Sequence, residues 1–364
     1  MANPKDPFAE QQYLMACAQL RVGQLEREQA NYEAALQAFE LAEEIFSMIG
    51  RDIDENRARL DIASVYADTR QYDRAEKLYL SVISAFKKLE VPSYACAAIG
   101  NLGNIYKDQG RYSQALRCYE HVIDFYESEK DARNQMLFMG NMAIVYQQRG
   151  EYEEAISLYE QSYRIHKEYG DLRGQAIVLG NLGTVYQQQE QFQRALDCCL
   201  EALQIFQQLE DKKNVGIFKG NCGEAFLRLQ DRERGIVFLK EAIVICDEVL
   251  PMAGGFFRGA LAQALAEKGD INRALSLCAE GEESVAAYPL EYATFLCRYA
   301  RIQIVNQNLG RAEELREKAE RIAMELGVQP DSSLVKAIRL LRADMGLDNL
   351  LFTEPLFPYR GGAS

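Results

Sequence analysis

The pattern of apolar and polar positions along the chain repeats every forty residues. The stretch "IGNLGNIYKDQGRYSQALRCYEHVI" from Ile99 has close counterparts forty residues before it and forty residues after it. A fixed period of roughly 20 to 50 residues predicts a repeat array, in which each unit packs on its neighbours. The regular copies begin at Gln19, Arg59, Ile99, Met139, Leu179 and Lys219.

Each copy contains two segments with helical periodicity. In the third copy Leu102 and Tyr106 share one apolar face, which indicates an amphipathic helix. We expect Ser93 to cap this helix and Gly110 to end it, with a second helix beginning near Tyr112. Two helices of roughly 15 residues joined by a short turn form an antiparallel hairpin, whose uncovered apolar side is covered by the next hairpin.

Small residues occupy one position in each of the two helices. Small side chains at these positions let the paired helices approach closely, so we interpret them as scaffold. In the first helix the position holds Gly23, Ala63, Gly103, Ala143, Gly183 and Gly223. In the second helix it holds Ala35, Ala75, Ala115, Ala155, Ala195 and Gly235.

The signature "L-G-x-x-Y" followed by "G-x-Y-x-x-A" resembles that of the tetratricopeptide repeat family. It is carried here by Leu102, Gly103, Tyr106, Gly110, Tyr112 and Ala115. The forty-residue period is similar to the longer-helix subgroup of kinesin light chain, Pins-type adaptors and bacterial peptide-regulated proteins. The resemblance covers about residues 12 to 325. It implies an all-α fold, a right-handed α-solenoid of stacked antiparallel helix hairpins, and a role in binding proteins or peptides.

The repeats divide the chain into five segments. We expect an N-terminal extension at 1–11, six regular repeats at 12–250, two divergent repeats at 251–328, a capping helix at 331–346 and an extended or disordered tail at 347–364. The stretch "LPMAGGFF" from Leu250 ends a long region without proline, so we expect a bend or altered stacking there.

Two adjacent columns on the first helices hold glycine and asparagine. The glycines are Gly100, Gly140, Gly180, Gly220 and Gly259, and the asparagines, which we call the Asn ladder, are Asn101, Asn141, Asn181 and Asn221. The family resemblance implies that first helices line a concave wall. There, Asn would donate to and accept from the backbone of an extended ligand, and Gly would leave room for it. The alternative is that each Asn bonds a neighbouring repeat and each Gly permits close helix packing.

A second row lies one to two turns beyond the Asn ladder and varies in chemistry. We expect this row to contact the side chains of the ligand and to give specificity. Its expected binding residues are Asn104, Thr184, Lys107, Gln147 and Gln187, and it also contains Ile144, Glu224 and Leu227.

The charge and hydropathy of the chain narrow the class of partner. There are 54 acidic and 41 basic residues, a net charge of −13, which argues against nucleic-acid binding and favours a partner with some basic character. No window approaches 18 uninterrupted apolar residues, and the N-terminus lacks the pattern of a signal peptide. We therefore expect a cytoplasmic protein that does not insert into membranes.

No constellation typical of catalysis or metal binding is present in the sequence. The nine cysteines form no CxxC pair and have no His at ligand spacing, so we expect packed thiols rather than disulfides or a zinc site. The histidines, His121 and His166, have no nucleophile beside them. We expect no enzyme activity, no metal and no cofactor.

These observations leave three functions open. The first is a non-enzymatic adaptor that binds an extended segment of a partner protein in its groove. The second is a self-assembling scaffold, in which the apolar tail from Leu350 to Tyr359 enters a groove. The third is a receptor for a small signalling peptide.

Overall fold

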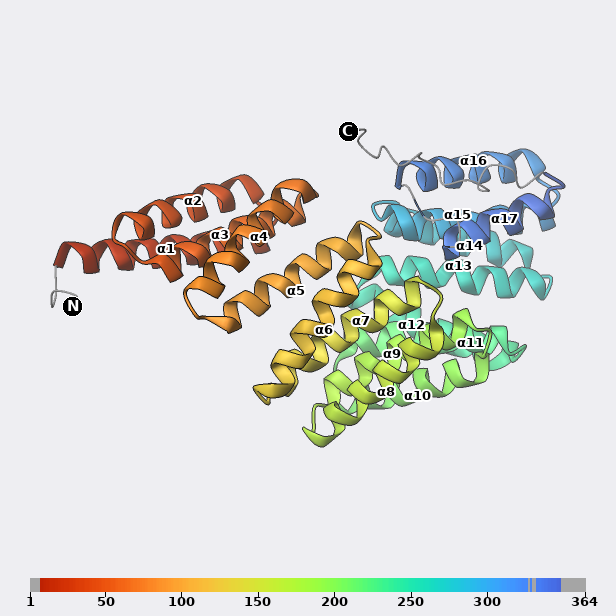
Figure 1. Ribbon diagram of the computed structural model, residues 1–364. Helices are drawn as coiled ribbons and strands as arrows, with labels where there is room; N and C mark the ends of the chain where they lie inside the picture. Colours follow the sequence, from red (N-terminus) through yellow and green to blue (C-terminus); the bar gives the residue numbers. More distant parts are fainter. Residues whose placement is uncertain (1–6, 327, 329–331, 348–364) are drawn as a thin grey trace. The chain divides into compact units, whose positions relative to one another are not determined.

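The computed structural model describes residues 7–326, 328 and 332–347, and its regular structure in these residues is entirely α-helical. The helices divide into two compact units, Met1–Gly170 and Asp171–Ser364, which are described separately (Figure 1). Unit 1 contains α1 (Pro7–Glu28), α2 (Tyr32–Met48), α3 (Asp52–Asp68), α4 (Tyr72–Lys88), α5 (Pro92–Asp108), α6 (Tyr112–Ser128), α7 (Ala132–Gln148) and α8 (Tyr152–Glu168). Unit 2 contains α9 (Leu172–Gln188), α10 (Phe192–Gln208), α11 (Lys212–Arg228), α12 (Arg232–Val249), α13 (Pro251–Glu267), α14 (Ile271–Val285), α15 (Pro289–Val305), α16 (Leu309–Leu326) and α17 (Ser333–Asp344). The prediction of an all-α stack of helix hairpins is confirmed.

A three-residue turn with one left-handed residue separates most consecutive helices. After α1, the backbone N–H of Asn31 donates to Glu26 O at 2.8 Å and that of Ala30 donates to Arg27 O at 3.0 Å. This pair of bonds satisfies the last carbonyls of the helix and requires a positive φ at the middle residue. Gly110 takes that role after α5, with φ +73°, as the sequence predicts.

Several of these turns use a residue with a side chain at the left-handed position. Lys130 has φ +58° and Glu190 has φ +59°. A left-handed conformation costs an L-residue about 1 kcal/mol. The three-residue turn is therefore kept even where glycine is absent. Two helices of seventeen residues with two such turns make up the forty-residue period.

Prolines set the starts of two helices differently from the sequence prediction. The sequence predicts that Ser93 caps α5, but α5 begins at Pro92 and its N-cap is Val91, which makes no side-chain cap bond. Proline suits the first helical position because its φ is fixed there and its missing N–H would have had no partner. Likewise α1 begins at Pro7, so residues 7–11, which we assigned to an extension, are helical.

The small-residue columns lie inside the hairpins, as predicted. Ala63, Ala115 and Ala143 are fully buried. A Cβ placed on Gly103 would lie 2.8 Å from Cε1 of Tyr119, a distance that real side chains do not reach. The two helices of this hairpin are therefore packed at a separation that excludes a larger residue.

The junction at Leu250 differs from the others. This one residue is both the C-cap of α12 and the N-cap of α13, with φ −156° and ψ 71°. The three-residue turn is absent, so α13 begins 39 residues after α11 rather than 40. This short connection lies at "LPMAGGFF", where the sequence predicts a bend or altered stacking.

The helix α17 closes the described part of unit 2 by packing on α15 and α16. The hydroxyl of Ser332 caps it by accepting from the N–H of Val335 at 3.3 Å. Its apolar face is fully buried and consists of Leu334, Val335, Ile338 and Leu341. Residues 348–364 lie outside the described residues, and so does the prediction made for the tail.

None of the described helices combines the length and the apolar character needed to cross a membrane.

Candidate functional site

The first helices of neighbouring hairpins contact one another directly within each unit. In unit 1, α3 contacts α1 and α5, and α5 contacts α7; in unit 2, α13 contacts α11 and α15. The second helices make their main contacts with first helices instead. First helices therefore form the inner side of each stack, and this inner side is the candidate binding surface.

The Asn ladder lies on these first helices, at the border between core and solvent. Asn101 is on α5, Asn141 on α7, Asn181 on α9 and Asn221 on α11, and each is partly exposed. The two residues that follow each Asn are buried, as Leu102 and Gly103 are after Asn101. The helix thus holds the amide at the rim of the core.

Asn141 is tied to the scaffold. Its Nδ2 donates to Oδ1 of Asn104 on the preceding first helix at 3.3 Å, and the hydroxyl of Tyr119 donates to the same Oδ1 at 2.7 Å. Tyr119 is fully buried. This three-residue network connects α5, α6 and α7, so at Asn141 the interpretation as a stacking contact applies. We call it the Asn104 network.

The other ladder residues have no such connection. Within the described part of the chain, the side chains of Asn101, Asn181 and Asn221 make no hydrogen bond to protein. The residue 37 positions before Asn101 is Ser64. Its hydroxyl already donates to Leu60 O and is hydrogen-bonded to the Tyr79 hydroxyl. These three amides therefore keep both their donors and their acceptor for a ligand.

The second row has mixed partners. Thr184 is exposed and its hydroxyl donates to Gly180 O within α9 at 3.1 Å, while Gln187 is exposed on the same helix. Lys107 is partly exposed, with its Nζ 3.5 Å from Asp108 Oδ1, and Gln147 is partly exposed on α7. In the structure Asn104 contacts Asn141. The other expected residues of the second row are divided between the units, with Lys107 and Gln147 in unit 1 and Thr184 and Gln187 in unit 2.

Glu224, also in the second row, forms a longer connection. Its carboxylate accepts from NH2 of Arg298 at 2.7 Å, although the two residues lie on α11 and α15. The guanidinium of Arg298 also lies over the ring of Phe256, 4.6 Å from the ring centre. This ion pair joins the first helices of the last three hairpins, and it engages a second-row carboxylate that the sequence predicts to face a ligand.

The glycine column is explained by aromatic rings on the next first helix. A Cβ on Gly100 would lie 2.3 Å from the ring of Phe138, and one on Gly220 would lie 2.1 Å from Phe257. Gly180 and Gly259 meet Phe218 and Phe295 in the same way. These glycines therefore permit close packing of helices rather than the approach of a ligand.

Gly140 is the exception in this column. Within unit 1, no atom lies within 4 Å of the place that its Cβ would take. The residue 38 positions later is Val178, whereas Gly100 and Gly180 are followed at that distance by phenylalanine.

Sequence reasoning missed Asp61, which holds the ladder position in the second repeat. Its carboxyl is bonded to Gln24, 37 residues earlier, which is the spacing of Asn141 and Asn104. Burial raises the pKa of Asp61 to about 6, although Arg27 and Arg57 oppose this effect. The signal was visible in the forty-residue alignment, because Asp61 stands forty residues before Asn101.

A buried hydroxyl in α8 shows what happens when the Asn104 network is not completed. Tyr159 is the counterpart of Tyr119 and is fully buried, but its hydroxyl has no partner among the described residues. Ile144 stands where Asn104 accepts in the preceding repeat. An unpaired buried hydroxyl destabilises the folded state.

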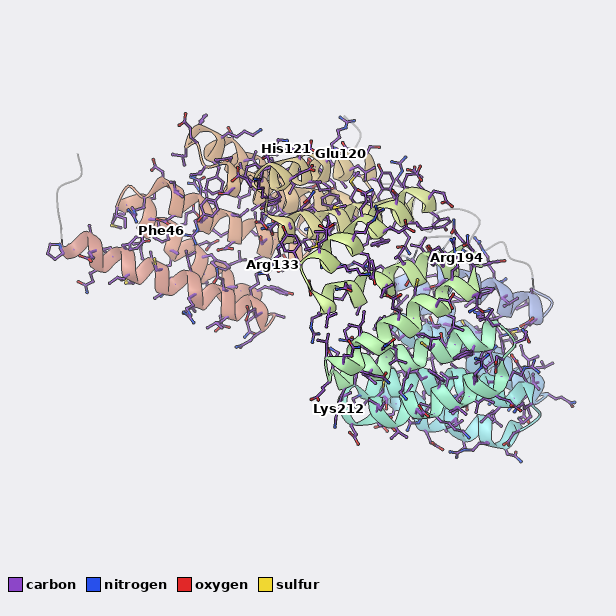
Figure 2. The ribbon with its side chains drawn as sticks, turned by 90° about the horizontal axis from the view of Figure 1, so that it is seen from below. Phe46, Glu120, His121, Arg133, Arg194 and Lys212 are labelled. Carbon is purple, nitrogen blue, oxygen red and sulfur yellow. The ribbon has the colours of Figure 1, made fainter. Side chains whose placement is uncertain are left out.

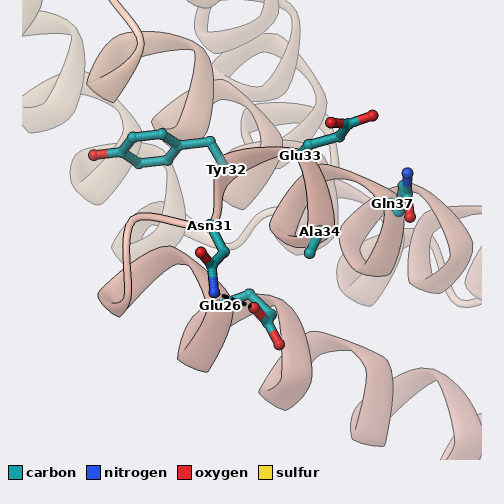
Figure 3. A pocket seen from close by; sticks show the side chains of 6 residues that line it. All are labelled: Glu26, Asn31, Tyr32, Glu33, Ala34 and Gln37. Atoms are coloured by element: carbon teal, nitrogen blue, oxygen red, sulfur yellow. Dashed lines mark hydrogen bonds between the residues drawn. The ribbon is translucent and has the colours of Figure 1, made fainter.

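The remaining polar features form no comparable site. A hollow of about 420 Å³ at the first hairpin is open and polar, and none of the expected binding residues lines it (Figure 3). Its lining includes Asn31, which donates to Glu26 at 2.9 Å. His121 is exposed on α6, where it follows Glu120 (Figure 2). The described residues contain no group of three His, Cys, Asp or Glu side chains that could hold a metal.

The fold of this chain is similar to those of several solved structures. The apo form of RapI is 14% identical, with 90% of this chain and 89% of that chain covered and a TM-score of 0.71. The apo form of the quorum sensor NprR from B. thuringiensis is 14% identical, with 85% and 88% covered and a TM-score of 0.59. A signal-transduction ATPase with a tetratricopeptide repeat sensor, from Pyrococcus horikoshii, is 18% identical, with 76% and 42% covered and a TM-score of 0.62. At these identities the similarity concerns the fold.

Family membership follows from the sequence match. No curated protein matches the chain. The model of the tetratricopeptide repeat matches residues 54–128, 93–168, 132–208 and 174–248, which together span more than half of the 364 residues. These matches lie on the hairpins that carry the Asn ladder. The chain therefore belongs to the tetratricopeptide repeat family.

Proposed function

We propose that the protein is a non-enzymatic adaptor that binds an extended segment of a partner protein along its first helices. The observation that carries this proposal is the set of ladder amides that have no protein partner, at Asn101, Asn181 and Asn221. A side-chain amide offers donors and an acceptor that match the peptide groups of an extended chain whatever its sequence. Asn141 contributes through the scaffold, because its amide is bonded to Asn104.

Selectivity comes from the second row in this proposal. Thr184 and Gln187 are exposed beside Asn181, and Lys107 and Gln147 are placed to contact ligand side chains in unit 1. The carboxyl of Asp61, together with the net charge of −13, favours a segment with basic residues. The nine free cysteines suit a reducing compartment, so we place the protein in the cytoplasm.

A receptor for a small signalling peptide is the second candidate. It is supported by the similarity of the fold to that of NprR, which is described as a quorum sensor, over 85% of this chain. The same ladder residues would be used. A short peptide and a protein segment differ in length rather than in the backbone groups that the amides recognise.

The test compares variants that remove either the ladder amides without a protein partner or the one that is hydrogen-bonded to Asn104. Wild-type protein, a triple variant with Ala at Asn101, Asn181 and Asn221, and the single variant Asn141→Ala are used as bait in native extract, with bound proteins and peptides identified by mass spectrometry. Glu120→Ala, on an exposed position of α6 (Figure 2), is the surface control. We expect one partner to be retained by wild type and Glu120→Ala and lost by the triple variant. Equal recovery with all four proteins, at equal helicity, would exclude the ladder as the binding site.

A further inference from the structure

Two cysteine side chains meet in the core between α10 and α11. The Sγ atoms of Cys199 and Cys222 lie 2.7 Å apart, and these residues are 7% and 0% exposed. The thiol of Cys199 also donates to Phe218 O at 3.4 Å. The other cysteines of the described chain do not make a contact of this kind with each other.

The two cysteines replace large side chains at the same interface. In earlier repeats the position of Cys199 is held by Tyr79, Tyr119 and Tyr159. The position of Cys222 is held by apolar residues elsewhere, for example Ile62, Leu102, Met142 and Leu182. Both large residues are thus lost together, in two helices that face each other, and two sulfur atoms occupy the space.

The apolar surroundings make the thiol of Cys199 less reactive. The thiols lie in an apolar cluster with Leu196, Leu203 and Phe226. The contact with Cys222 and burial both raise the pKa of the Cys199 thiol. Because the thiolate is the reactive form, the Cys199 thiol reacts slowly in the native state and faster at higher pH.

We propose that Cys199 and Cys222 form a reversible disulfide that links the fifth repeat to the sixth. Their Sγ separation is close to the bond length of a disulfide, about 2.05 Å, so little movement of the helices is needed. With a peroxide as oxidant, one thiol sulfur attacks a peroxide oxygen, giving a sulfenic acid and one water. The second thiol then attacks the sulfenic sulfur and releases a second water, so that two thiols and one hydrogen peroxide give one disulfide and two waters.

The disulfide would act on the candidate binding surface through the helices it joins. Cys222 directly follows Asn221 on α11, and Cys199 lies on α10, which pairs with the helix that carries Asn181. The bond therefore fixes the separation of two repeats whose ladder amides have no protein partner. Disulfides in reducing compartments are typically transient and redox-sensing, and this one would be of that kind.

The test is oxidation of the full-length native protein, followed by peptide mapping. The protein is treated with hydrogen peroxide, the remaining thiols are alkylated, and tryptic peptides are analysed without reduction. The expected product is a cross-link between peptides 195–212 and 220–228, which contain Cys199 and Cys222 and are joined with the loss of two hydrogen atoms. The midpoint of thermal unfolding should rise by about 5 °C and return after treatment with dithiothreitol.

Peptide 195–212 also contains Cys198, so variants are needed to assign the bond. The variant Cys198→Ser should retain the cross-link and Cys199→Ser should lose it, with Cys222→Ala as the reciprocal control. Absence of the cross-link in oxidised wild-type protein, which requires no variant to fold, would overturn the proposal. So would a cross-link that persists in Cys199→Ser and is lost in Cys198→Ser.

Discussion

The fourth hairpin of the array, in unit 1, and the fifth and sixth hairpins, in unit 2, use the same asparagine column differently. In unit 1, Asn141 is bonded to Asn104, which also accepts from the buried hydroxyl of Tyr119. In unit 2, Asn181 and Asn221 have no protein partner among the described residues, and the tyrosine position holds Cys199 or Leu239. One residue type in one column thus serves stacking at Asn141 and remains available for a ligand at Asn181 and Asn221, as it does at Asn101.

The largest expected effect concerns the glycines beside this column. Gly220→Ala in unit 2 would place a Cβ 2.1 Å from the ring of Phe257, so we expect a loss of about 3 kcal/mol in the free energy of unfolding. Gly140→Ala in unit 1 meets no atom and should be neutral or stabilising by up to about 1 kcal/mol. Urea unfolding of both variants measures the difference. Equal losses would show that Gly140 is packed as closely as Gly220.

The second prediction separates binding from stability. Once a ligand is identified, Ala at both Asn181 and Asn221 should weaken its affinity at least roughly tenfold, since each lost hydrogen bond contributes about 1 kcal/mol. Unfolding should be unchanged, because these amides have no protein partner. Asn141→Ala should instead lower the free energy of unfolding by about 1 kcal/mol. Calorimetric titration and urea unfolding provide the two measurements, and a reversed pattern would contradict the comparison.

The third prediction concerns two buried tyrosines in unit 1. Tyr119→Phe removes the donor to Asn104 Oδ1 and should destabilise the fold by about 1 kcal/mol. Tyr159→Phe removes a hydroxyl that has no partner among the described residues, and should be neutral or slightly stabilising. The measurement is the midpoint of thermal unfolding of the two variants, each of which loses one tyrosine hydroxyl. A larger loss for Tyr159→Phe would show that its hydroxyl has a partner.

The last expected effect depends on pH. The pKa of Asp61 is raised from 3.8 to about 6 in the folded state, so ionisation of this carboxyl costs stability above pH 6 and the cost disappears below pH 4. Asp61→Asn, which restores the ladder residue, should therefore stabilise the protein at pH 7 by at most roughly 3 kcal/mol, the energy of a shift of about two pKa units. The gain should vanish at pH 4. Urea unfolding at both pH values measures it, and a gain that is constant with pH would argue against ionisation as the cause.

Much of the fold could be predicted from the sequence because local rules repeat. The helical period, the small-residue columns and Gly110 as a helix end all follow from spacing and from residue size. The turns at Lys130 and Glu190 could not be assigned from residue type, because neither residue favours a left-handed conformation. At these two turns the end of the helix is predicted by the forty-residue spacing of the repeats and not by the type of the turn residue.

The candidate site was less predictable because its roles depend on pairs of residues about forty positions apart. The asparagines look alike in sequence, and only the residue 37 positions earlier distinguishes Asn141, preceded by Asn104, from Asn101, preceded by Ser64. The glycines likewise gain meaning from the aromatic residues that follow on the next first helix. One repeated position in the alignment therefore indicates where a site lies. The role of each residue there depends on a second position, about forty residues away, whose side chain it contacts.

The one-residue connection at Leu250 also has a consequence for how the gene can change. From α2 to α11, helices of seventeen residues and turns of three form a constant module, so loss or duplication of a forty-residue block within one unit leaves the remaining helix starts of that unit in phase. Beyond it, the starts of α13 and α15 are 38 residues apart. Recombination across Leu250 would shift the phase, so we expect the array to tolerate a change in length on the N-terminal side of this residue better than a change across it.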